Sequence, residues 1–301
     1  MDIELYIDQP NDYAFDIGAP VYHPHVSIIS YDEAGAIRHT LNRFNVYALF
    51  LQKEFPEDLV YGIGKYDHAQ GSLLAYSPGQ IGGKPDDGTT RQYHGWVLMF
   101  DAAFIQGTEI ERQLANYHFF SYNANEALIL TDGEKEILYG LMANIRKELS
   151  QHSDEAYIDA IVKDYILLIL DYCNRFYSRQ FKELSTEGVN ILARFQQLLT
   201  DYYEKGLQQK YGFPNVSYCA RELCLSSGYF GDILRNSTGD TPKNYISHFV
   251  IMRSKNLLLS GMRISQVAEE LGFEYANHFT RLFKKVTGLT PSDFLASQYQ
   301  K

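Results

Sequence analysis

Residues suited to contacting nucleic acid lie near the C-terminus, on a segment whose apolar residues recur at the spacing of an amphipathic helix. Its apolar positions are Phe279, Leu282, Phe283 and Val286. Its polar positions are Asn277, His278, Thr280, Arg281, Lys284 and Lys285. Asparagine can bond to adenine and arginine to guanine through paired hydrogen bonds, and lysine neutralises phosphates. The pattern therefore predicts a helix that buries its apolar face and turns its polar face toward double-stranded DNA.

An earlier segment, residues 216–242, repeats the sequence pattern of residues 264–291. The matched pairs are Ala220 with Ala268, Leu223 with Leu271, Phe230 with Phe279 and Gly239 with Gly288. Each copy predicts a short helix, a tight turn and a longer helix ended by glycine, which is helix-turn-helix construction. The candidate DNA contacts of the first copy are Ser227, Tyr229, Arg235 and Asn236. Asp232 stands where the second copy has Arg281, so the first copy is expected to contact few bases or to orient a neighbouring arginine.

Charge is distributed unevenly along the chain. Residues 188–301 hold 13 lysine and arginine residues against 9 aspartate and glutamate residues, a net charge of +4. Residues 1–187 hold 14 against 28, a net charge of −14. A mildly basic module attached to an acidic body is consistent with nucleic-acid binding. The length of 301 residues suits two domains, and 45% hydrophobic residues suit a folded globular protein.

The sequence lacks the signals of membrane insertion and export. No apolar stretch reaches the roughly 20 residues of a membrane helix, and the N-terminus has no basic and apolar signal regions. Three cysteines are too few for a disulfide framework. Cys219 and Cys224, both in the first repeat copy, are expected to fill the core. We therefore expect a cytoplasmic protein with no membrane partner.

The order of patterns predicts an α+β protein. Residues 1–130 are β-rich, with apolar runs at 44–51, 71–76 and 95–100 separated by turn residues, as in a sandwich or small barrel. Residues 131–181 form two amphipathic helices, starting at a capping box from Thr131 to Glu134, that either pack on the β domain or form a dimer interface. Residues 182–188 are a polar linker, and residues 189–301 form the all-α DNA-binding domain.

The repeat resembles the AraC/XylS family of bacterial transcriptional regulators. The resemblance covers residues 189–299, and residues 264–273 and 279–294 carry it, with Leu295 where the family usually has arginine. It implies a sequence-specific transcriptional regulator with two helix-turn-helix motifs joined by a long helix over about Pro242 to Ser260. It further implies an N-terminal cupin-like sensing domain for a small-molecule effector, and a homodimer. RNA polymerase is a further partner of such a regulator.

Aromatic and histidine residues in the β-rich region could line an effector pocket. These candidates are Phe44, Tyr66, His68, Tyr76, His94 and Trp96, and ordinary packing in the core is the alternative for each. The identity of an effector does not follow from them.

Two other classes of function remain open. His23, His25 and Glu33 could bind a metal, which would favour a cupin-type metalloenzyme with a fused helical domain. Pro24 is awkward in a strand, however, so we predict no metal and no cofactor. No catalytic motif occurs, so we predict that the chain is not an enzyme. The third hypothesis is a protein–protein adaptor whose repeat binds a partner helix.

Overall fold

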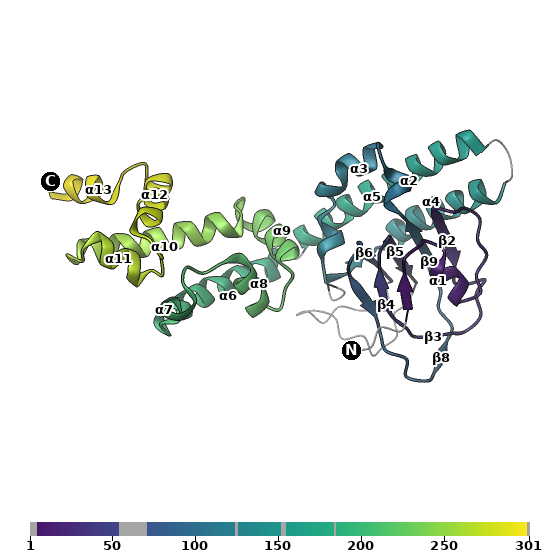
Figure 1. Ribbon diagram of the computed structural model, residues 1–301, viewed down its shortest axis with the longest axis horizontal. Helices are drawn as coiled ribbons and strands as arrows, with labels where there is room; N and C mark the ends of the chain where they lie inside the picture. The colour runs from purple at the N-terminus through teal and green to yellow at the C-terminus, as the bar shows by residue number, and fades with distance from the viewer. Residues whose placement is uncertain (1–4, 54–70, 124–125, 152–154, 184, 300–301) are drawn as a thin grey trace. The chain divides into compact units, whose positions relative to one another are not determined.

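The computed structural model describes residues 5–53, 71–123, 126–151, 155–183 and 185–299 (Figure 1). The chain divides into two compact units, residues 1–180 and residues 181–301. The first unit contains all the described strands together with several helices, and the second is helical. The mixed α+β class predicted from the sequence is therefore confirmed. No described helix is both long and apolar enough to cross a membrane.

Three sheets make up the β part of the first unit. The largest has five antiparallel strands in the order β10 (Leu128–Ile129), β6 (Ser72–Tyr76), β5 (Tyr47–Gln52), β9 (Gly95–Phe100) and β2 (Val26–Ser30). A second has the order β1 (Leu5–Ile7), β4 (Leu41–Phe44) and β7 (Ile81–Gly83), with β1 parallel to β4. The third pairs β3 (Ile37–Arg38) with β8 (Thr90–Arg91). The predicted strands at 71–76 and 95–100 are present, whereas the expected run 44–51 is divided between β4 and β5.

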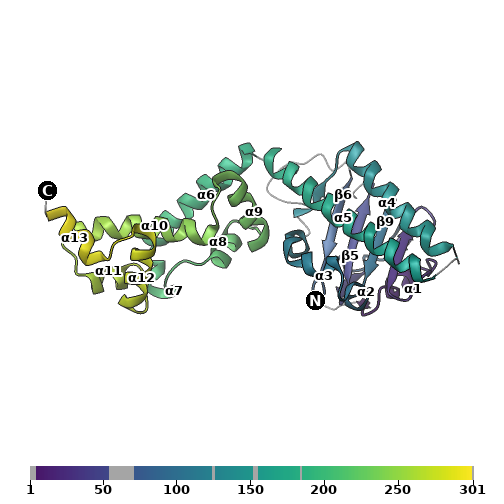
Figure 2. The same ribbon diagram turned by 90° about the horizontal axis from the view of Figure 1, so that it is seen from above.

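Both faces of the five-stranded sheet are buried. Val97 and Met99 of β9 belong to one core cluster with Phe44 of β4 and Ile7 of β1, so this face packs toward the three-stranded sheet. Leu98 points the opposite way because side chains alternate along a strand, and it is also fully buried. Helix α4 (Asp132–Ser150) contacts β2 and β9, and Figure 2 shows α4 and α5 (Glu155–Glu183) running across this sheet.

Helix α4 begins where the sequence predicts. The Thr131 hydroxyl accepts from the Glu134 backbone N–H at 3.4 Å, and the Glu134 carboxylate accepts from the Thr131 N–H at 2.9 Å. This capping box satisfies two backbone donors at the helix start. Glu134 also forms a 2.7 Å ion pair with Arg179 of α5, which joins the two long helices. Shorter helices of this unit are α1 (Asp12–Asp16), α2 (Ala102–Ile105), α3 (Glu109–Gln113), η2 (Leu114–Asn116) and η3 (His118–Ser121).

The predicted linker 182–188 is helical in the described residues. Helix α5 continues to Glu183, and α6 (Ser185–Glu204) begins two residues later, while residue 184 lies outside the described residues. The polar composition of this stretch therefore marks a change of helix rather than an extended connection.

The second unit is built around one central helix. Its remaining helices are α7 (Leu207–Tyr211), α8 (Val216–Glu222), α9 (Ser227–Thr238), α10 (Pro242–Leu259), α11 (Ile264–Glu270), α12 (Ala276–Thr287) and α13 (Pro291–Tyr299). Helix α10 contacts α9, α11, α12 and α13, and it spans nearly the residues expected for the long connecting helix. Gly239 and Gly288 end α9 and α12 with φ of +74° and +81°, as the sequence predicts.

Candidate nucleic-acid interface

Helix α12 is fixed in place by its apolar face. Phe279 and Phe283 are fully buried, one helical turn apart, with ring centroids separated by 5.7 Å. Phe279 also contacts Phe273 at 5.5 Å, and Phe283 contacts Phe294 of α13 at 5.6 Å. Leu282, like Val286, is only partly buried. The predicted apolar stripe is therefore present, and two aromatic residues form its centre.

The polar face of α12 is open to solvent. Its exposed side chains are Asn277, His278, Arg281, Lys284 and Lys285. In the part of the chain that the structure describes, none of these five forms an ion pair or a side-chain hydrogen bond. Three cations on one helix face, none of them in an ion pair with a described residue, give a local positive potential, which attracts phosphates. Thr280 is partly buried and donates its hydroxyl to the Ala276 carbonyl at 3.0 Å, so its donor is used within the helix.

On helix α9, unlike on the exposed face of α12, polar side chains form contacts within the helix. Asp232 is buried, and its Oδ1 lies 2.7 Å from Nη1 of Arg235. Asn236 donates from Nδ2 to the Asp232 backbone carbonyl at 2.8 Å. Arg235 and Asn236 remain exposed, as does Ser227 at the start of the helix. The sequence leaves two possibilities for the first copy: it contacts few bases, or Asp232 orients a neighbouring arginine. The ion pair with Arg235 corresponds to the second possibility.

Tyr229 is a correction to the predicted DNA contacts. Its side chain is buried, and its ring lies 5.2 Å from that of Phe181, which also belongs to the second unit. The alignment of the repeats places Tyr229 opposite the exposed His278, but the apolar spacing in α9 indicates the inward position. The buried residues of that stripe are Tyr229, Phe230, Ile233 and Leu234.

The turns that carry α9 and α12 have the same backbone geometry. Cys224 and Gly272 occupy equivalent positions with φ of +61° and +82°. In both turns this residue donates its N–H to the carbonyl three residues earlier, and the next residue donates to the carbonyl five residues earlier, all at 2.9 Å. Cys224 is exposed, which corrects its expected core role, whereas Cys219 is buried and burial raises the pKa of its thiol to about 12.

Similarity to known proteins agrees with this geometry. Residues 219–297 match the family model of the helix-turn-helix domain. LumQ of Photobacterium leiognathi, named "Probable transcriptional regulator", is 23% identical over 247 residues, which cover 80% of this chain and 89% of LumQ. RhaR of Yersinia pseudotuberculosis, named an HTH-type transcriptional activator, is 30% identical over 111 residues, or 36% of this chain and 37% of RhaR. The chain therefore carries a helix-turn-helix domain and is similar to transcriptional regulators, which agrees with its resemblance to the AraC/XylS family.

The matched helix-turn-helix domain lies wholly in the second unit. The chain spans little more than a third of the length of RhaR. The activator role named for RhaR is therefore stated of RhaR alone. A crystal structure of ToxT from Vibrio cholerae is 15% identical and covers 90% of this chain and 96% of ToxT, with a TM-score of 0.30. That score is too low to compare the two folds in detail.

The four predicted effector residues that the structure describes do not form one site. Phe44 and Tyr76 stack on each other in the core with ring centroids 4.5 Å apart, and burial raises the pKa of Tyr76 to about 12. Trp96 precedes Val97 in β9 and so points to the other face of the sheet. His94 is exposed and lies 2.6 Å from Asp32. Tyr66 and His68 lie outside the described residues.

The residues proposed for a metal have separate partners. His23 pairs with Asp159 at 3.1 Å, His25 with Asp101 at 2.7 Å, and Glu33 with Arg146. Within the described ranges, no group of three histidine, cysteine or carboxylate side chains is arranged to hold a metal ion. The geometry therefore does not favour the metalloenzyme hypothesis.

Proposed function

We propose that the regulator binds operator DNA through both helix pairs, α8 with α9 and α11 with α12, each acting as a helix-turn-helix unit. The observation that carries this proposal is the exposed polar face of α12, with three cations beside a fully buried aromatic stripe. The shared turn geometry supports a DNA-facing role for α9 as well. Because α10 separates the two pairs, they would enter successive major grooves of one DNA face.

The side chains of α12 divide between two roles. Asn277 and Arg281 are suited to paired hydrogen bonds with base edges, adenine and guanine respectively. Lys284 and Lys285 lie further along the helix and would neutralise phosphates, which fixes the position of the protein without selecting sequence. His278 would add a polar contact next to Asn277. The Thr280 hydroxyl donates to the Ala276 carbonyl, so toward DNA it would act only as an acceptor.

Helix α9 would make a weaker contribution to base selection. The Asp232 carboxylate would repel phosphate. It also pairs with the Arg235 guanidinium, so the orientation of the Arg235 side chain is fixed in the absence of DNA. Ser227 and Asn236 remain available as polar contacts. The subsite that faces α9 should therefore show less base preference than the one that faces α12.

The first unit would provide sensing and dimerisation. Its β-rich, cupin-like part has a core of its own, which suits a domain that binds a small-molecule effector. Helix α5 exposes large apolar side chains at helical spacing: Tyr157 at 69%, Ile161 at 38% and Leu168 at 42%. An exposed apolar stripe of this kind marks an interaction surface, and we assign it to a second copy of the chain. Contact with RNA polymerase remains a prediction without an assigned surface.

Selection of bound sequences from a random duplex library with the full chain tests this function. We expect a motif with two subsites about one helical turn apart. On the selected site, Arg281→Ala should cost about 1–3 kcal/mol and relax preference at one base. Lys285→Ala should weaken binding to every sequence and reduce the salt slope by about one.

Lys147→Ala provides the matched control, because Lys147 is an exposed lysine on α4 of the first unit. It should leave both quantities unchanged. Unaltered affinity in the Arg281 and Lys285 variants would refute the assignment of the α12 face. Absence of any duplex binding would instead favour the adaptor hypothesis.

A further inference from the structure

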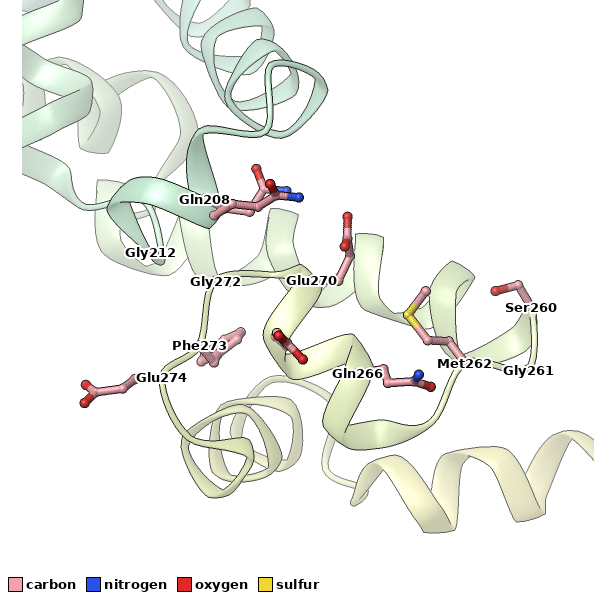
Figure 3. A pocket seen from close by; sticks show the side chains of 12 residues that line it. Gln208, Gly212, Ser260, Gly261, Met262, Gln266, Glu270, Gly272, Phe273 and Glu274 are labelled. Atoms are coloured by element: carbon pink, nitrogen blue, oxygen red, sulfur yellow. The ribbon is translucent and has the colours of Figure 1, made fainter.

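A pocket of about 950 Å³ lies in the second unit, beside the turn between α11 and α12. It is lined by α7, by the end of α10 and the loop after it, by α11, and by the residues that lead into α12 (Figure 3). Its size falls in the range of small-molecule sites, about 300–1,000 Å³. Neither the DNA-facing side chains nor the candidate effector residues line it.

Three carboxylates give the pocket its charge. Glu269, Glu270 and Glu274 line it and are exposed, and none of them forms an ion pair with a described residue. The basic residues next to the lining in sequence have other contacts. Lys210 lies over the Tyr211 ring at 5.0 Å, and Arg263 donates to the Gln266 side-chain carbonyl at 3.2 Å. The pocket therefore has a net negative charge and would favour a cationic occupant.

A buried acceptor points independently to a ligand. Gln208 is only 3% exposed, and its side-chain carbonyl oxygen has no hydrogen-bond partner among the described residues. In Figure 3 its side chain extends into the same space as that of Glu270. Buried acceptors are rarely left without a donor, because the lost hydration is not otherwise replaced. A ligand N–H group would supply the missing donor.

The arrangement of the carboxylates indicates the kind of cation. They do not converge on a point: no described group of three histidine, cysteine or carboxylate side chains is placed to hold a metal ion. An elongated ligand with several separate positive charges would satisfy them better. Phe273 and Met262, also in the lining, offer apolar surface for methylene groups between those charges. We propose that this pocket binds an aliphatic polyamine, with its ammonium groups on the glutamates and on the Gln208 oxygen.

Calorimetric titration of the full chain with spermidine tests the proposal without DNA. We expect saturable binding of one ligand per chain. Glu270→Gln removes one charge from an exposed position and should weaken binding at least tenfold. Gln208→Met removes the buried acceptor at similar side-chain volume and should also weaken it. Glu136→Gln, at an exposed position of α4, makes the same charge change outside the pocket and should leave binding unchanged.

Two comparisons separate this site from diffuse attraction to an acidic protein of net charge −10. Putrescine should bind, whereas 1,4-butanediol, which has the same carbon chain without charge, should not. The proposal is overturned if spermidine gives no saturable binding, if butanediol binds as well as putrescine, or if Glu136→Gln weakens binding as much as Glu270→Gln. Equal competition by magnesium chloride at matched ionic strength would also overturn it.

Discussion

Gly272 is the position in the second unit where a single added methyl group should cost most. Its φ is +82°, a left-handed conformation that an L-residue adopts at a cost of about 1–2 kcal/mol. A Cβ atom there would also lie 2.6 Å from the carbonyl carbon and 2.8 Å from the carbonyl oxygen of Gly212. Both neighbours are backbone atoms, so no side-chain rotation can relieve the contact.

The expected magnitude follows from these two terms. Ordinary contacts of a Cβ atom begin at 3.4 Å, so the Gly212 backbone would have to move by about 0.8 Å. Overpacking of this kind typically costs a further 1–3 kcal/mol. We therefore expect Gly272→Ala to lower the free energy of unfolding of the second unit by roughly 2–5 kcal/mol.

Gly288→Ala is the matched control. Gly288 has nearly the same φ, +81°, but no atom lies within 4 Å of the position of its Cβ. This variant should show only the conformational cost, about 1–2 kcal/mol. The difference between the two variants therefore isolates the close approach of residues 212 and 272.

The chain allows the two units to be followed separately. Trp96, the single tryptophan, lies in the first unit, so its fluorescence reports unfolding of that unit. Circular dichroism at 222 nm follows the helices of both units. In urea, Gly272→Ala should move the second unit's transition down by about 1 M or more, given a slope of roughly 1–3 kcal/mol/M. The fluorescence midpoint should stay fixed. Equal shifts in the Gly272 and Gly288 variants would refute the reasoning.

Three further predictions concern charge and assembly. Asp232→Asn removes the carboxylate 2.7 Å from Arg235 and should strengthen binding to random duplex DNA, with Asp164→Asn as an unaffected control; filter binding against salt concentration measures both. Leu168→Glu places a charge in the exposed stripe of α5 and should convert a dimer into a monomer in sedimentation equilibrium, and a monomeric wild type would contradict this. Burial lowers the pKa of His23 below its ordinary 6.5, so the unfolded chain takes up the proton more readily. The first unit should therefore lose stability as pH falls below about 6.5, and His23→Gln should reduce that loss in denaturation followed by Trp96 fluorescence.

The helices of the second unit follow from local signals in the sequence. Caps, glycine stops and apolar spacing act over a few residues, and the duplicated pattern shows them twice. Tyr229 is the exception there, because its alignment with the exposed His278 and the apolar spacing of α9 predict opposite faces, and its burial follows the spacing. The predicted linker at 182–188 lies next to the boundary between the two units, but its described residues are helical, because polar composition alone does not distinguish a helix from an extended segment.

The candidate effector site could not be predicted in the same way. Whether two aromatic residues face each other depends on the register of strands that are far apart in the sequence. Phe44 and Tyr76 meet in the core because β4 lies over the five-stranded sheet, and Trp96 points away because it is one residue from Val97. Residue type alone identifies aromatic side chains but gives neither their face nor their neighbours.

The two helix-turn-helix turns show how tertiary contact, rather than backbone conformation, decides where glycine is required. Cys224 and Gly272 have equivalent positive φ angles and equivalent hydrogen bonds, yet only the second is glycine. Cys224 is exposed, so its side chain has room and only the conformational cost applies. Gly272 lies against the backbone of Gly212, and the rings of Phe213 and Phe273 pack 5.0 Å apart beside it. The same close approach brings α7 against the α11–α12 turn. The pocket lined by Gln208 of α7 and by α11 therefore depends on a contact that the sequence of the repeat does not encode by itself.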